Sequence, residues 1–340
     1  MSASQPARRL RRAPLAFAFC AALAIAAPIA SAHDDSDRVD DLLRTVKRAR
    51  TIDLSHTWEI TSPIAGVNPP YSFELVATHA LYVPPGFPAP PRPGTRGFFG
   101  DGGQLSFAAE VMHFSGQHGA PSIDALGHIG RNGKLFHGVD GAAATSNSNG
   151  IGTSGVGANL AIDQYPNDLL INRGVLLDVA RLVNGNMEPL PATFEITAKH
   201  LEQAASKQKV KLKRGDTVLI RTGWGQYFKA NPDLYKGDNS PGLGLNGAEF
   251  LIRHGARVVG NDTLTFEQRP PVATVNGVLQ VFPVHMRLIP DSGIYIVENF
   301  NLEELAKAKA YEFAIVVPPL KVLGGTGSAL RAFALVAKDD

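Results

Sequence analysis

The sequence predicts an α/β or α+β fold that is built on a central mixed sheet. Short apolar or β-branched runs are typical of buried strands, and they recur along the chain. These strand candidates are residues 51–54, 174–179, 216–222, 256–260, 294–297, 311–317 and 329–336. Helix signals alternate with only some of the runs, which favours a sheet with both parallel and antiparallel strands.

Capping residues and apolar spacing indicate where the helices lie. The helix candidates are residues 36–48, 197–208, 248–254 and 302–308. Ser36 and Thr197 are expected N-caps, and Gly255 is an expected C-cap. Proline and glycine are dense between residues 68 and 103, so we expect a long surface loop there.

Residues 1–32 are predicted to be an export signal. Arginines at positions 8, 9, 11 and 12 precede an apolar stretch over 14–29, and Ala30-Ser31-Ala32 is an A-x-A cleavage pattern. We expect cleavage after Ala32 and a single mature domain over 33–340, in the periplasm or outside the cell. An N-terminal membrane anchor is the alternative, and the paired arginines leave both the general secretory and the twin-arginine routes open.

Charge and cysteine content exclude several classes of protein. The 340 residues have a formal net charge of +2, and removal of residues 1–32 would leave 308 residues with −2. This balance argues against nucleic-acid binding, and no apolar run after the signal is long enough for a membrane span. Cys20 is the only cysteine and leaves with the signal. The mature chain therefore has no disulfide, no thiolate nucleophile and no Cys-ligated zinc.

Histidine and carboxylate residues gather in two places. Four of the ten histidines fall between 113 and 137, where His118, Asp124 and His128 stand among glycine and proline. Near the C-terminus, His285 and Glu298 flank a strand-like segment. Imidazole and carboxylate suit Zn²⁺ or Mn²⁺ when no thiolate is present, whereas a hydrogen-bonded or solvated polar group is the simpler interpretation of any one residue.

The stretch from His118 to His128 resembles the H-x-G-T-H-x-D-x-P-x-H motif of the metal-dependent cyclase superfamily. That superfamily includes bacterial kynurenine formamidase and isatin hydrolase. The similarity extends along most of the mature chain, in the family's order, through residues 53–56, 174–179, 215–224, 240–244, 260–263, 283–285 and 298–302. The resemblance implies a swivelling β/β/α-type catalytic domain, assembled as a homodimer or homotetramer.

The resemblance also implies roles for five residues. His118 matches the first motif histidine, a metal ligand, and Asp124 matches the aspartate that binds or bridges metals. His128 matches the last histidine, the general acid/base. His285 and Glu298 match the distal metal ligands.

The chain departs from this motif at two positions. Ala120-Pro121-Ser122 replaces G-T-H, so Ser122 stands where the family has a histidine ligand, and Leu126 replaces the motif proline. Gln117 or His113 could take the place of the missing ligand. The number of bound metals, one or two, therefore stays open.

The function implied by the resemblance is hydrolysis of an amide, N-formyl or cyclic amide bond by metal-activated water. Zn or Mn would be the cofactor and a small molecule the substrate. An aromatic substrate would need an apolar wall, for which the candidates, each equally suited to the core, are Trp58, Phe73, Phe107, Phe114 and Trp224. The alternatives are a metal-dependent cyclase or dehydratase on the same fold, and a metal-poor binding protein without turnover.

Overall fold

The computed structural model describes residues 32–66, 68, 71–77, 108–152, 154–271, 274–275 and 277–337. Apart from Ala32, the predicted export signal lies outside these residues. The chain divides into two compact units at Thr45 and Val46. Most of helix α1 (Ala32–Arg48) belongs to the first unit, and this helix contains the predicted segment 36–48. Among the described residues, no helix combines the length and apolar character that a membrane span requires.

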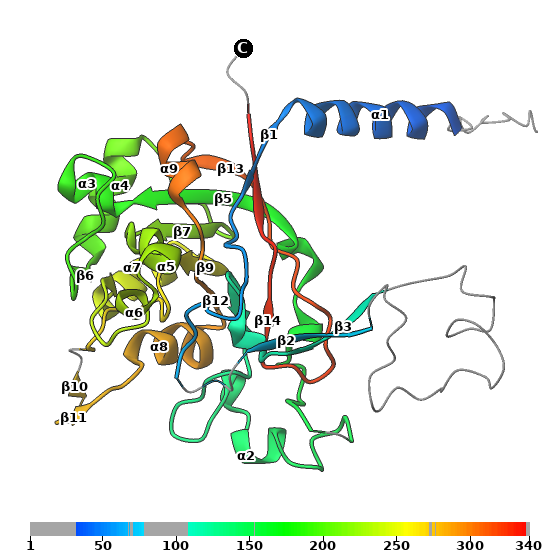
Figure 1. The fold of residues 1–340 in the computed structure, drawn as a ribbon, viewed down its shortest axis with the longest axis vertical. Coiled ribbons are helices and arrows are strands. Elements are labelled where there is room, and N and C mark those ends of the chain that lie inside the picture. The colour runs from blue at the N-terminus through cyan, green and yellow to red at the C-terminus, as the bar shows by residue number, and fades with distance from the viewer. Residues whose placement is uncertain are drawn as a thin grey trace, which may run out of the picture. The chain divides into compact units, whose positions relative to one another are not determined.

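Nine strands of the described residues form one mixed sheet in the second unit. They are β1 (Arg50–Asp53), β4 (Ser122–Asp124), β5 (Ile171–Asp178), β7 (Thr217–Arg221), β9 (Val258–Asn261), β12 (Tyr295–Glu298), β13 (Glu312–Val316), β14 (Gly327–Ala329) and β15 (Phe333–Val336). Their spatial order is β1-β15-β13-β5-β7-β9-β12-β4-β14. Figure 1 shows the central strands β5, β7, β9 and β12 one after another in this order. The strands β5, β7, β9 and β12 run parallel, and the outer pairs are antiparallel. The predicted mixed sheet is therefore confirmed.

Alternate side chains of the central strands enter two different cores. On one face, Val218 and Ile296 pack in a cluster with side chains of the helices α3 (Val179–Asn184), α4 (Ala198–Gln208), α7 (Leu245–Arg253) and α8 (Pro283–Ser292). On the other face, Leu219 and Val297 pack with side chains of α9 (Glu303–Ala308). This alternation is expected when both faces of a sheet are covered.

The predicted helices end at or next to the expected residues, but α1 begins at Ala32, so Ser36 lies inside this helix and is not its N-cap. Thr197 is the N-cap of α4, where its side chain and that of His200 form reciprocal bonds with the backbone. The segment 248–254 lies in α7, which begins three residues earlier, at Leu245. Short helices α2 (Gly141–Ala144), α5 (Tyr227–Ala230) and α6 (Pro232–Tyr235) complete the α-helices of the described chain.

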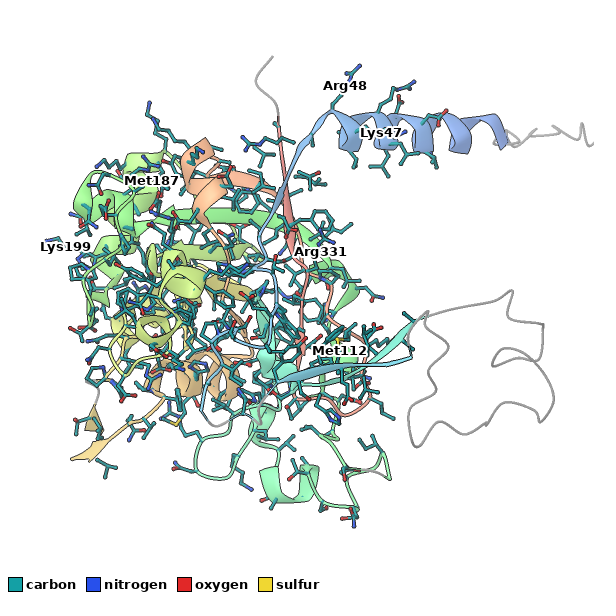
Figure 2. The ribbon with its side chains drawn as sticks, viewed as in Figure 1. Lys47, Arg48, Met112, Met187, Lys199 and Arg331 are labelled. Carbon is teal, nitrogen blue, oxygen red and sulfur yellow. The ribbon has the colours of Figure 1, made fainter. Side chains whose placement is uncertain are left out.

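Within the described residues, three two-stranded ribbons accompany the sheet. They are β2 (Ser72–Ala77) with β3 (Ala109–His113), β6 (Glu195–Ile196) with β8 (Gly242–Leu243), and β10 (Thr274–Val275) with β11 (Val278–Leu279). The strand β2 lies inside the predicted loop 68–103, so that prediction was wrong for residues 72–77. Most of the remaining loop lies outside the described residues. Met112 lies on β3 of the first ribbon (Figure 2) and is 47% exposed.

The segment 329–336 and the strand β4 differ from the prediction because of how the strands pair in the sheet. The segment 329–336 was expected to be one strand but forms the end of β14 and all of β15. Ala329 pairs with Ser122 of β4, whereas Phe333 pairs with Asp53 of β1, so the two halves join opposite ends of the sheet. The strand β4 was not expected, because three residues among glycine and proline give no periodic signal.

Candidate metal centre

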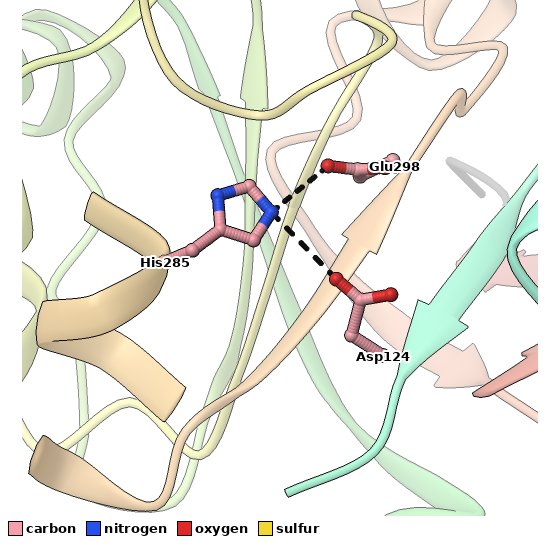
Figure 3. A group of neighbouring side chains, drawn as sticks. All are labelled: Asp124, His285 and Glu298. Carbon is pink, nitrogen blue, oxygen red and sulfur yellow. Dashed lines mark hydrogen bonds and ion pairs between the residues drawn. The ribbon is translucent and has the colours of Figure 1, made fainter. Parts of the chain in front are cut away.

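Asp124, His285 and Glu298 converge in the interior. Among the described residues they form a group whose potential ligand atoms all lie within 4.8 Å of one another. The Nε2 atom of His285 is 3.1 Å from Glu298 Oε1 and 3.6 Å from Asp124 Oδ2. Figure 3 shows these two approaches, with one imidazole nitrogen facing both carboxylates. All three residues are buried.

Strand pairing brings the two carboxylates together. The strands β4 and β12 are antiparallel neighbours, in which Asp124 pairs with Ile296 and Ser122 pairs with Glu298. Because side chains alternate along a strand, these four residues share one face of the sheet. Ile296 packs in the core beneath α8, and α8 carries His285. The centre therefore lies between the sheet and α8.

Glu267 is a fourth member of this site that was not predicted from the sequence. Its carboxylate accepts hydrogen bonds from the backbone N–H groups of Val284 and His285, both at 3.2 Å, in the first turn of α8. Its Oε1 is also 2.5 Å from His285 Nδ1. A carboxylate at a helix N-terminus is favourable, and a bond to Nδ1 leaves Nε2 free for a metal. An acid seven residues after the strand candidate 256–260 offered no sequence signal for this contact.

Burial and charge perturb the titration of this group. Burial alone would lower the pKa of His285, but its hydrogen bonds to Glu267 and Glu298 raise the pKa well above the ordinary value. Burial raises the pKa of Glu298 to about 7, against the lowering effect of the His285 hydrogen bond, and Asp124 adds to the rise. A proton on His285 balances part of the negative charge here, and a metal ion would compete with that proton.

His128 lies next to the converging group. Its Nε2 is 3.7 Å from Asp124 Oδ1, and its side chain is 28% exposed. Its Nδ1 is 3.2 Å from the side-chain nitrogen of Gln117. His128 and His285 therefore approach different oxygens of the Asp124 carboxylate.

Three other candidate residues lie in the same stretch of the chain. His118 ends the 3₁₀ turn η1 (Gly116–His118), but its side chain lies outside the described part of the structure. His113 is exposed at the end of β3, where it pairs with Ser72. Gln117 is engaged with His128 and Thr326. These contacts of His113 and Gln117 are with residues other than Asp124, His285 and Glu298.

The donor set fits a divalent cation. Three buried carboxylates, those of Asp124, Glu267 and Glu298, surround the single imidazole of His285. Such an excess of buried negative charge is costly without a compensating cation. On the same strand face, the hydroxyl of Ser122 is buried and has no hydrogen-bond partner among the described residues. Asp124, His285 and Glu298 could hold the ion, with one nitrogen and carboxylate oxygens as donors.

Aromatic side chains gather beside the motif segment. Trp58 makes edge contacts with Tyr71 and Phe114, with ring centroids 5.4 and 5.7 Å apart. Trp224 is buried in a cluster with Ala120. Phe73 is 46% exposed on β2, and Phe107 lies outside the described residues.

A cavity of about 630 Å³ lies in the same region, and Ser55, His56, Trp58 and Ala329 contribute to its lining. This volume is within the range of small-molecule sites.

The fold and the site define a family. A family model described as "Putative cyclase" matches residues 52–268, more than half of the chain. The chain therefore belongs to this cyclase family.

Individual relatives are similar to different extents. The isatin hydrolase of Roseibium aggregatum is 28% identical over 133 residues, which cover 36% of this chain and 46% of that protein. The match thus spans less than half the length of this curated relative. A crystal structure of a novel cyclase has a TM-score of 0.69 and 29% identity, covering 88% of this chain and 92% of that one. Isatin hydrolase A from Labrenzia aggregata, bound to benzyl benzoate, has a TM-score of 0.61 and 20% identity, with 90% and 100% covered. This last likeness shows a shared fold.

Proposed function

We propose that the chain is a metal-dependent hydrolase that cleaves the C–N bond of an amide, N-formyl or cyclic amide substrate, in the manner of an arylformamidase or cyclic amidase. The observation that carries the proposal is the convergence of Asp124, His285 and Glu298, with Glu267 fixing the orientation of His285. The partial similarity to an isatin hydrolase supports the same class of reaction.

The reaction adds water across the C–N bond. A bound Zn²⁺ or Mn²⁺ would polarise the substrate carbonyl and make hydroxide available near neutral pH. His128 is placed to act on the reacting groups, because its Nε2 faces Asp124 while its other nitrogen is held by Gln117. The hydroxyl group joins the carbonyl carbon, and the hydrogen goes to the leaving nitrogen.

Metal analysis combined with turnover tests this proposal. Elemental analysis of the purified protein should show bound Zn or Mn, and a panel of formyl-anilides, isatin and lactams should include a compound that is hydrolysed. Bound metal with a ring-closed or dehydrated product would indicate the cyclase alternative. Absence of both metal and turnover would indicate the binding protein, for which the Ser122 substitution is the motivating observation.

Two variants distinguish a metal ligand from a catalytic residue by their metal content and activity. Asp124→Ala should lose metal and activity together, because it removes a hard anionic ligand. His128→Ala should keep the metal content and the folded state while kcat falls by ~10²-fold or more. Equal metal loss in both variants would mean that His128 is a ligand. Full activity in His128→Ala would remove it from the mechanism.

We also propose that the mature protein is exported and self-associates. The export signal over 1–32 supports the first point. The exposed apolar side chains of the β2–β3 ribbon, Phe73, Leu75 and Met112, support the second, since an isolated ribbon rarely leaves such a face open. Light scattering of the purified mature protein should give the mass of a dimer or tetramer.

A further inference from the structure

Gln117 occupies a narrow position beside His128. The turn η1 packs so closely on β14 that a Cβ atom on Gly116 would lie 2.4 Å from the carbonyl oxygen of Gly327. A Cβ on Gly327 would lie 2.4 Å from the side-chain nitrogen of Gln117. Gly327 therefore leaves room for the amide, and Gly116 allows the turn to approach β14. The same nitrogen is 3.2 Å from His128 Nδ1 and 3.3 Å from the hydroxyl oxygen of Thr326.

These contacts determine where a neutral His128 carries its proton. An amide nitrogen only donates hydrogen bonds, so Nδ1 of His128 accepts, and the proton resides on Nε2. Nε2 faces Oδ1 of Asp124 at 3.7 Å. If the amide were turned around, its oxygen would accept from Nδ1–H, and the lone pair of Nε2 would then oppose a carboxylate. The contact of His128 with Asp124 is thus a second, independent reason for the orientation in which the Gln117 amide nitrogen donates to His128 Nδ1.

We propose that Gln117 is a positioning residue that holds His128 as the Nε2–H tautomer. In this form Nε2 cannot accept a proton from water. His128 then serves as a hydrogen-bond donor to the negative charge that develops on the substrate, and it does not bind metal through Nε2. The catalytic part of this inference rests on the proposed hydrolase function, whereas the tautomer itself does not. Donors that face a developing oxyanion typically contribute ~10²–10³-fold to kcat.

Nitrogen chemical shifts test the tautomer without reference to activity. Full-length mature protein labelled with ¹⁵N-histidine and loaded with Zn²⁺ would be studied well above the ordinary imidazole pKa, with His128→Gln to assign the signals. The wild type should show a protonated Nε2 and an unprotonated Nδ1 at His128. Gln117→Glu, similar in size but only an acceptor, should protonate Nδ1. A protonated Nδ1 in the wild type, or an unchanged ring in Gln117→Glu, would overturn the proposal.

Kinetics of the same variants test the donor role. For a compound that the wild type hydrolyses, Gln117→Glu and Gln117→Met should lower kcat by ~10²-fold, with KM and metal content nearly unchanged. Gln164→Met is the matched control, because Gln164 also lies on a 3₁₀ turn, η3 (Ile162–Gln164), and contacts only Asp163 among the recorded side-chain bonds. A switched tautomer with unchanged kcat would refute the donor role. If the wild type hydrolyses none of the compounds, the hydrolase proposal fails, and the nitrogen shifts still decide the role of Gln117.

Discussion

Glu267 connects the start of α8 to the imidazole of His285 and is not part of the group that Asp124, His285 and Glu298 form. Partners of this kind orient a ligand and increase its basicity, and their loss typically lowers metal affinity by 10–100-fold. We expect Glu267→Gln to show a loss of that size in a Zn²⁺ titration. The half-buried ion pair between α7 and α8 offers a control, because Glu249→Gln removes a carboxylate whose hydrogen bonds, within the described residues, are to Arg287. An affinity equal to that of the wild type would exclude Glu267 from the metal site.

His56 should make stability depend on pH. It stacks on Phe228 with ring centroids 4.1 Å apart, and its Nε2 is buried with no partner among the described residues. Burial lowers the pKa of His56 to about 4, a backbone hydrogen bond with Phe300 opposes this, and Lys229 lowers it further. The unfolded imidazole, with a pKa of ~6.5, binds a proton that the native state does not.

The free energy of unfolding should therefore fall as the pH falls from about 6.5 to about 4. The full effect of this one residue is about 3 kcal/mol at ~1.4 kcal/mol per pKa unit. Urea unfolding at several pH values should show a weaker decline for His56→Phe, which keeps the ring stacking but cannot be protonated. Parallel curves for the wild type and the variant would contradict this account.

At the scale of elements, a buried arginine joins β5, β7 and α9. The Arg221 side chain is fully buried, with Nη1 3.0 Å from Asp178 Oδ1 and Nε 2.8 Å from Glu303 Oε1. Its Nη2 donates to the carbonyl oxygen of Met187, a residue labelled in Figure 2. Removal of one partner from such a group leaves buried charges uncompensated.

Arg221→Met should therefore lower the free energy of unfolding by about 3–5 kcal/mol. Arg331→Met is the matched control, because Arg331 is 84% exposed and binds Asp53 at the surface. This second variant should change the stability by less than about 1 kcal/mol. Denaturant unfolding of both variants makes the comparison, and similar losses in the two would show that the buried cluster has no special role.

The elements and site residues differ in how far the sequence predicts them. The central strands and α4 were predicted because each has its own apolar run or cap. The strand β4 was not, because Ser122 to Asp124 become a strand only through pairing with β12 and β14. Glu298 and His285 were singled out because they flank a strand-like segment, and the family resemblance then implied their role as ligands. Glu267 was not, because its role depends on a loop that meets the start of α8.

At the scale of the whole molecule, export can be tested by mass. Protein from the native host should begin at His33, because the A-x-A pattern ends at Ala32. Intact-mass measurement would reveal the loss of residues 1–32. Ala32→Leu places a large side chain at the last position before the cleavage site, where a small residue is required. The uncleaved form should therefore accumulate. A wild-type protein that retains residues 1–32 would favour the membrane anchor.

The antiparallel pairing of β4 with β12 brings Asp124 next to Glu298, which lies near the other end of the chain. The ligand group consequently does not exist in a partly synthesised or unfolded chain, and metal can enter only after the last third of the protein has folded. A chain secreted unfolded would thus acquire its metal outside the cytoplasm, and a chain exported folded would acquire it inside. Since metal availability, together with geometry and ligand type, determines which metal a site takes up, the place of folding would influence whether zinc or manganese fills the site.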